Sequence, residues 1–186
     1  MNEGMSNPKS WVPSSGFNAN GPTQRSPSNY TATVKQFEVE TNPRYVRGHD
    51  GDPKNGLETY CNIFVSDVTL SMGCEIPHWV DAATGAPVAM GKGVEQSANK
   101  VFVWMNAHSL VYDWMECGER QARRRASAGF PTVVIWGNPN GIGHVAMVLP
   151  GTDFTHIAQA GGTNFFDREI HVGFGNATPL MFYTHD

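Results

Sequence analysis

The sequence predicts a single α+β domain, with helices in the first part of the chain and an antiparallel sheet after them. The main observation is a change of texture near residue 130. Before this point apolar residues recur at helical spacing, and after it short β-branched and apolar runs alternate with Gly, Pro and Asn turns. Helices followed by strands are typical of an α+β fold. A length of 186 residues suits one domain with a tail.

The first 28 residues differ in composition from the rest of the chain. They are rich in Asn, Ser, Pro and Gly and show little periodicity. We therefore expect residues 1–28 to form a flexible N-terminal arm and residues 29–186 to form the domain.

Five segments are predicted to be helices, most of them from the spacing of their apolar residues. Asn42-Pro43 ends the first, the second stops near Gly73, and Gly129 ends the last, whose arginines are expected to form a solvated face. The predicted helices are residues 30–39, 61–72, 97–105, 108–115 and 119–128. Residues 76–87 are expected to be irregular, with Trp79 as the wall of a groove.

Five later segments are predicted to be the strands of an antiparallel meander. Thr132 to Trp136 is β-branched and apolar, and Gly137-Asn138-Pro139-Asn140-Gly141 is a turn that leads to the next strand. The predicted strands are residues 132–136, 144–149, 154–160, 169–174 and 180–183.

Cys61 opens the predicted helix at residues 61–72. Thr59 is a plausible N-cap, which puts Cys61 in the first helical turn. A thiol in this position feels the positive end of the helix dipole and nearby unpaired N–H groups, so the thiolate is favoured. This is how a fold holds a cysteine nucleophile; the alternative is a small buried residue at the start of an amphipathic helix.

His144 begins a predicted strand directly after Gly141-Ile142-Gly143. Glycine at this point allows another group to approach the imidazole closely. Because imidazole titrates near neutral pH, it can accept the proton of a thiol and later protonate a leaving amine. The alternative is a histidine at a strand edge that bonds a backbone carbonyl.

Three further side chains could complete the site. The carbonyl of Gln159, on the next strand, could accept the imidazole N–H and fix its tautomer, and Asn164 is the second candidate for this role. His156 is at an odd offset from Gln159 and should face the other side of the sheet. Tyr60 could donate its phenol to an oxyanion hole beside the N–H of Cys61, or could simply pack.

The order of these residues along the chain resembles that of the papain-like CHAP amidases and NlpC-type peptidases. The resemblance is carried by Tyr60-Cys61-Asn62-Ile63-Phe64-Val65, Gly143-His144-Val145-Ala146-Met147-Val148 and Ala158-Gln159-Ala160-Gly161, and it extends over residues 30–183. It implies a papain-like fold and a phage or bacterial hydrolase that cleaves an amide bond of peptidoglycan, within the stem peptide or between peptide and sugar. Asn62 and Gln159 depart from the residues common in these families at the corresponding positions.

Composition and motifs narrow the other possibilities. The net charge of −4 gives no footprint for nucleic acid or an anionic membrane, and no apolar run is long enough to span a bilayer. The first residues lack the features of a signal peptide, so we expect synthesis in the cytosol and action on the cell wall after release or delivery. We expect a monomer whose partner is peptidoglycan.

We predict neither a metal nor a cofactor. The sequence has no His-Glu-x-x-His and no Cys-x-x-Cys, and its three cysteines form no close pairs. Asp50, Asp52 and Asn55 lie where some CHAP relatives bind calcium, but their spacing is not that of an EF-hand and an Asx-rich turn is expected. Two alternative functions stay open: a thiol acyltransferase or transglutaminase on the same fold, and a non-catalytic structural or wall-binding virion protein.

Overall fold

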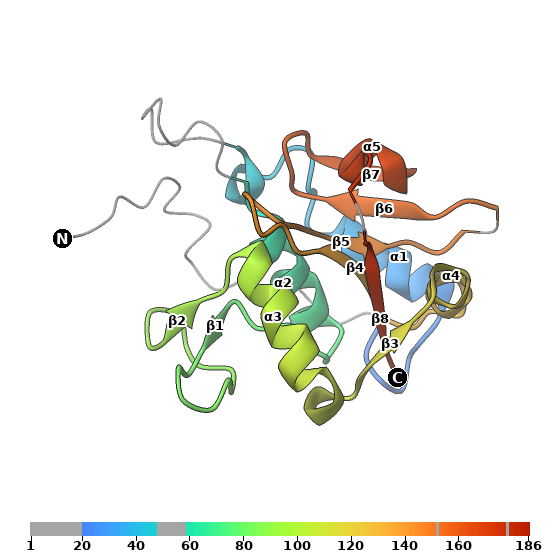
Figure 1. Ribbon diagram of the computed structural model, residues 1–186. Coiled ribbons are helices and arrows are strands. Elements are labelled where there is room, and N and C mark those ends of the chain that lie inside the picture. Colours follow the sequence, from blue (N-terminus) through green and yellow to red (C-terminus); the bar gives the residue numbers. More distant parts are fainter. Residues whose placement is uncertain (1–19, 48–58, 152, 178) are drawn as a thin grey trace.

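A six-stranded antiparallel sheet forms the centre of the protein (Figure 1). The structure is a computed structural model that describes residues 20–47, 59–151, 153–177 and 179–186. The strand order is β3-β8-β4-β5-β6-β7. The strands are β3 Trp114–Cys117, β4 Thr132–Trp136, β5 His144–Val148, β6 His156–Gln159, β7 Phe165–Glu169 and β8 Met181–His185. The predicted α+β class, with helices and an antiparallel sheet, is confirmed.

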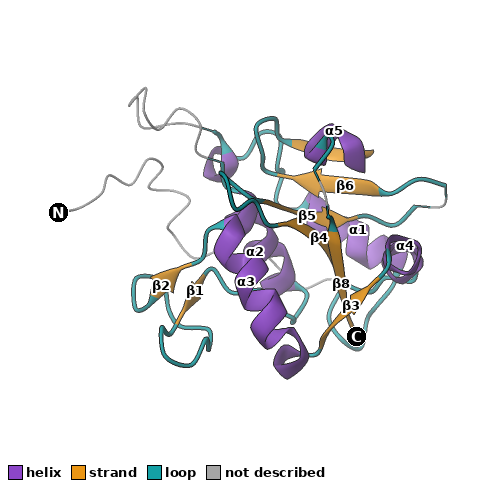
Figure 2. Cartoon of the chain, in the orientation of Figure 1, coloured by secondary structure: helices purple, strands orange, loops and turns teal. Residues whose placement is uncertain are grey.

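Helices cover both faces of this sheet (Figure 2). They are α1 Pro27–Lys35, α2 Cys61–Ser71, α3 Ala98–His108, α4 Glu119–Ser127 and α5 Ile170–Phe174. Side chains alternate along β5: Val145 and Met147 join the core under α2 and α3, and Ala146 and Val148 join the core under α4 and α5. The sheet is therefore buried on both sides, and α2 is held rigidly against the start of β5.

The described part of the predicted arm packs against the domain. Asn20 is fully buried, and its Nδ2 donates to the carbonyl of Gly129 at 2.8 Å. Ser26 caps α1 by accepting from the N–H of Asn29 at 3.1 Å, and Pro27 occupies the first turn. Residues 20–28 thus belong to the folded domain, and residues 1–19 lie outside the described residues.

The prediction of a helix at residues 108–115, directly after α3, is wrong. A short 3₁₀ turn, Ser109–Tyr112, is followed by Asp113 with a left-handed φ of 58°, and the chain then enters β3. Trp114 faces His185 in the ladder with β8. Strand pairing with a segment about 70 residues away overrides the local helical spacing, and a local pattern cannot reveal such a partner.

The predicted strand at residues 169–174 is also wrong. The strand is β7, which ends at Glu169, and residues 170–174 form α5. Ile170 and Phe174 are four residues apart and both pack into the core under α4 and α5, which is helical spacing in a segment too short to be recognised. In addition, β8 does not close the meander but lies between β3 and β4.

The segment predicted to be irregular, residues 76–87, contains one strand of a small two-stranded sheet. β1 Trp79–Val80 pairs with β2 Val94–Glu95, beside α2 and α3 (Figure 1).

Across the residues that the structure describes, no helix has both the length and the apolar character needed to cross a bilayer.

Candidate active site

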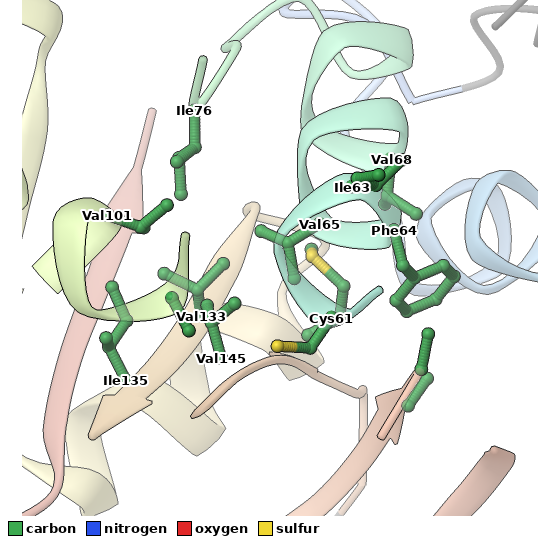
Figure 3. Packing of buried hydrophobic residues seen from close by; sticks show 14 of the residues in the cluster. Cys61, Ile63, Phe64, Val65, Val68, Ile76, Val101, Val133, Ile135 and Val145 are labelled. Carbon is green, nitrogen blue, oxygen red and sulfur yellow. The ribbon is translucent and has the colours of Figure 1, made fainter. Parts of the chain in front are cut away.

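Cys61 is the first residue of α2 and is only 1% exposed. The N-cap is Tyr60 rather than the predicted Thr59; it makes no side-chain capping bond, and its carbonyl accepts from the N–H of Phe64 at 2.9 Å. Figure 3 shows Cys61 at the start of α2 with Val65 and Val145 nearby in the core. The thiol is therefore in the first helical turn, where the dipole and free N–H groups favour its anion.

Three donors act on the thiol. Burial raises the pKa of Cys61, but the charge and hydrogen bond of His144, the backbone N–H of Val145 and the hydroxyl of Thr59 together bring the pKa below its usual value. β6 pairs with β5 only at Met147 and Val148, so the first residues of β5 have no partner on β6.

The pKa values of the other two cysteines shift in the opposite direction. Burial raises the pKa of Cys74 to about 12, only partly opposed by Arg25. Burial also raises the pKa of Cys117. Cys61 thus stands apart from Cys74 and Cys117 in both its partner and its acidity.

His144 begins β5 and is oriented by Gln159. The His144 Nε2 lies 2.6 Å from Gln159 Oε1, and Gln159 Nε2 donates to the carbonyl of Thr163 at 2.9 Å, which fixes the direction of the amide. With Nε2 engaged, Nδ1 is the ring nitrogen available to the thiol. Burial lowers the pKa of His144, but the charge and hydrogen bond of Cys61 and the Gln159 bond raise it above its usual value.

The remaining predicted residues lie elsewhere or pack. The Nδ2 of Asn164 donates to the carbonyls of Val39 (3.0 Å) and Tyr45 (2.7 Å), so Asn164 does not orient the imidazole. His156 pairs with Asp167, Nδ1 to Oδ1, at 2.6 Å. Tyr60 is 5% exposed and belongs to the core cluster; its contact with a substrate oxygen stays a prediction.

The approach to His144 is held by Asn99 of α3. Asn99 Oδ1 accepts from the N–H of Asn138 at 2.8 Å, and its Nδ2 donates to the carbonyl of Gly141 at 2.8 Å. A Cβ at Gly143 would clash with Asn99 and lie 2.7 Å from the carbonyl of Trp136. Gly143 is therefore needed to seat this turn on α3, and its role in the approach of a substrate to the imidazole stays a prediction.

The glycine beside the imidazole is Gly161. A Cβ there would lie 2.7 Å from Gln159 Nε2 and 3.2 Å from His144 Cε1. The ring of Phe174 in α5 also packs on the His144 ring, with centroids 4.7 Å apart. The sequence carried no signal for Asn99 or Phe174, because both act through contacts formed only in the folded chain.

Within the described ranges, no group of three His, Cys, Asp or Glu side chains could hold a metal ion. Asp50, Asp52 and Asn55 lie outside the described residues.

Neither a comparison with protein-family models nor a search of curated proteins found a match to this chain.

The arrangement contains the groups that nucleophilic acyl transfer uses. A cysteine of lowered pKa, an imidazole of raised pKa and a neutral amide that orients the imidazole are the three groups that a thiol nucleophile requires. The two shifts have the same cause, because the thiolate and the imidazolium stabilise each other.

Activity is expected to follow a bell-shaped pH profile. The acid limb reports deprotonation of the thiol, and lies below the usual range of cysteine because the Cys61 pKa is lowered. The alkaline limb reports loss of the imidazolium proton and lies above the usual range of histidine because the His144 pKa is raised. Both limbs belong to the coupled pair. The measurement is kcat/KM against pH; a single rise centred at the pKa of an ordinary thiol would contradict the ion pair.

Gly173→Ala tests the Gln159–His144 bond with a minimal change. A Cβ at Gly173 would clash with Gln159 Oε1, the atom that lies next to His144 Nε2. A neutral hydrogen bond is worth about 0.5–1.5 kcal/mol, so we expect kcat/KM to fall on the order of 3- to 10-fold. The alkaline limb should also move to lower pH, because this bond raises the His144 pKa.

Gly118→Ala is the matched control for this variant, since no atom lies within 4 Å of a Cβ at Gly118. It should leave both the rate and the pH profile unchanged. An unmoved alkaline limb in Gly173→Ala would show that the Gln159 bond does not tune the imidazole.

Proposed function

We propose that this protein is a papain-like cysteine amidohydrolase that cleaves an amide bond of peptidoglycan. The observation that carries the proposal is the convergence of Cys61, His144 and Gln159 from α2, β5 and β6, with the 2.6 Å contact between His144 and Gln159. Cys61 and His144 are more than 80 positions apart in the sequence, and only the fold brings them together.

The proposed reaction has two steps. In the first, the Cys61 thiolate attacks the amide carbonyl, the C–N bond breaks as the His144 imidazolium protonates the leaving amine, and a thioester forms. In the second, His144 takes a proton from water, the resulting hydroxide attacks the thioester, and the C–S bond breaks to release a carboxylic acid and the thiolate. The N–H of Cys61 is available to stabilise the oxyanion in both steps, with Tyr60 as a second proposed donor.

The resemblance of three segments to CHAP amidases and NlpC-type peptidases supports peptidoglycan as the substrate. These segments contain the nucleophile, the base and the orienting residue, which are the positions that matter for the reaction. The proposal covers a bond within the stem peptide and the bond between the peptide and the sugar.

The test is digestion of purified peptidoglycan followed by mass spectrometry of the soluble products. We expect fragments with one new carboxyl end and one new amino end, in amounts that depend on active enzyme. Cys61→Ala is the control that should release nothing. Release of fragments by Cys61→Ala, or no release by either protein from several peptidoglycan types, would contradict the proposal.

The same assay separates the two alternatives. With a primary amine added in excess, a transferase would give a new amide in place of the free acid. A non-catalytic wall-binding protein would sediment with peptidoglycan, release no fragment, and contain a Cys61 that is no more reactive than Cys117.

A further inference from the structure

A cavity of about 370 Å³ lies beside the C-terminal half of α2, separate from the Cys61–His144–Gln159 site. Its walls are mainly apolar, formed by Leu70, Trp79, Pro87, Val88 and Met90. Leu70 is nine residues after Cys61, which corresponds to about 13–14 Å along a helix axis. The volume is in the range of pockets that hold small ligands or a single side chain.

One carboxylate in this cavity, that of Glu75, forms no ion pair within the described residues. Glu75 is half-buried, and within the described ranges no hydrogen bond or ion pair reaches its side chain. Burial raises the pKa of Glu75, and His78 partly opposes this shift. A bound cation would offset the partial desolvation of this carboxylate.

The other charged or titratable groups around the cavity already have partners. Arg44 forms a two-point ion pair with Asp67, with Nε to Oδ2 at 2.5 Å and Nη2 to Oδ1 at 2.9 Å. His78 Nε2 lies 2.9 Å from Glu95 Oε1. The unbalanced charge in the cavity is therefore negative and is located at Glu75.

We infer that this cavity binds an alkylammonium group, such as the side chain of a lysine in a peptide. The Glu75 carboxylate would pair with the ammonium, and the apolar walls would cover its methylene chain. Trp79 adds an aromatic wall, which favours a cation over a neutral group of the same shape.

Hydrogen bonds connect the cavity to the nucleophile. Asn62, the residue after Cys61, donates from Nδ2 to the carbonyl of Gln96 at 2.7 Å. The N–H of Gln96 donates to the carbonyl of His78 at 2.8 Å, and His78 lines the cavity. If the proposed function is correct, the alkylammonium group belongs to a diamino acid of the substrate peptide; this extension rests on that proposal, whereas the binding itself does not.

The test is a titration of the full-length Cys61→Ala protein with Nα-acetyl-lysine N-methylamide at millimolar concentrations. Binding is followed by two-dimensional NMR through the indole N–H of Trp79. We expect a saturable shift, and the norleucine counterpart, which keeps the methylene chain without the amine, should bind on the order of 10-fold more weakly. Glu75→Gln should weaken the lysine compound by a similar factor. Glu116→Gln, which removes an exposed carboxylate on β3, is the matched control and should not change binding.

Three results would overturn the inference: no shift of the Trp79 signal, equal binding of the lysine and norleucine compounds, or unchanged binding in a folded Glu75→Gln protein. The comparison of the two compounds needs no change at Glu75, so it stands even if that variant does not fold. Because no turnover is measured, failure of this binding is distinguishable from failure of the hydrolase proposal.

Discussion

Cys61→Ala is expected to reduce release of peptidoglycan fragments to background, a loss of at least about a thousand-fold. Without the sulfur no thioester can form, and the remaining groups have no nucleophile to activate. The loss should occur without unfolding, because the change removes one atom from a residue at the first position of α2. Circular dichroism and melting temperature check the fold, and fragment release checks the activity.

Thiol labelling provides the same test without a substrate. Iodoacetamide at neutral pH should modify Cys61 before Cys74 or Cys117, because only the Cys61 pKa is lowered and the other two are raised. Activity should fall in step with the labelling of Cys61. A Cys117→Ser protein is the control and should lose activity to the reagent at the same rate. Faster labelling of Cys74 or Cys117, with activity lost in parallel, would reject Cys61 as the nucleophile.

The sequence predicted the central part of the sheet because its strands are locally distinctive. Thr132–Trp136 was predicted with its observed bounds, and β5 was predicted to begin at His144. Both strands are buried on both faces, so they are continuous apolar runs bounded by Gly and Asn turns. The start of α2 at Cys61 was also predicted, although the N-cap was assigned to Thr59 instead of Tyr60.

Elements that depend on distant partners could not be predicted from local pattern. β3 follows a left-handed residue, Asp113, and becomes a strand because β8 pairs with it. α5 is a five-residue helix whose apolar residues also fit a strand. Yet α5 supplies Phe174, which packs on the imidazole, and Gly173, which gives Gln159 Oε1 the space it needs. The sequence therefore predicted the site residues themselves but not the residues that surround them.

The choice between Gln159 and Asn164 illustrates this limit. The sequence favours Gln159, which lies on the strand predicted after His144, and keeps Asn164 as the second candidate. In the fold, the turn after β6 carries Asn164 away from His144, to the carbonyls of Val39 and Tyr45. Gln159 stays on the last position of β6, and its amide is held by the carbonyl of Thr163.

His144→Ala should cost nearly as much activity as Cys61→Ala, on the order of a thousand-fold or more, because nucleophile and base act as a unit. The change removes the group that accepts the thiol proton and the cation that stabilises the thiolate. The Cys61 pKa should therefore rise towards that of a buried thiol, and the pH at which iodoacetamide labelling is half-maximal should rise with it. Labelling at neutral pH should become slow.

Two variants control for other effects of His144→Ala. His156→Ala removes a histidine whose contact with Asp167 lies in exposed surroundings, and it should leave turnover and labelling unchanged. The double variant Cys61→Ala/His144→Ala should be no less active than Cys61→Ala, since the base has no role once the nucleophile is absent. If His144→Ala keeps near-normal turnover and its Cys61 is labelled as fast as in the unmodified protein, the ion pair is not the source of thiol reactivity and the catalytic assignment is wrong.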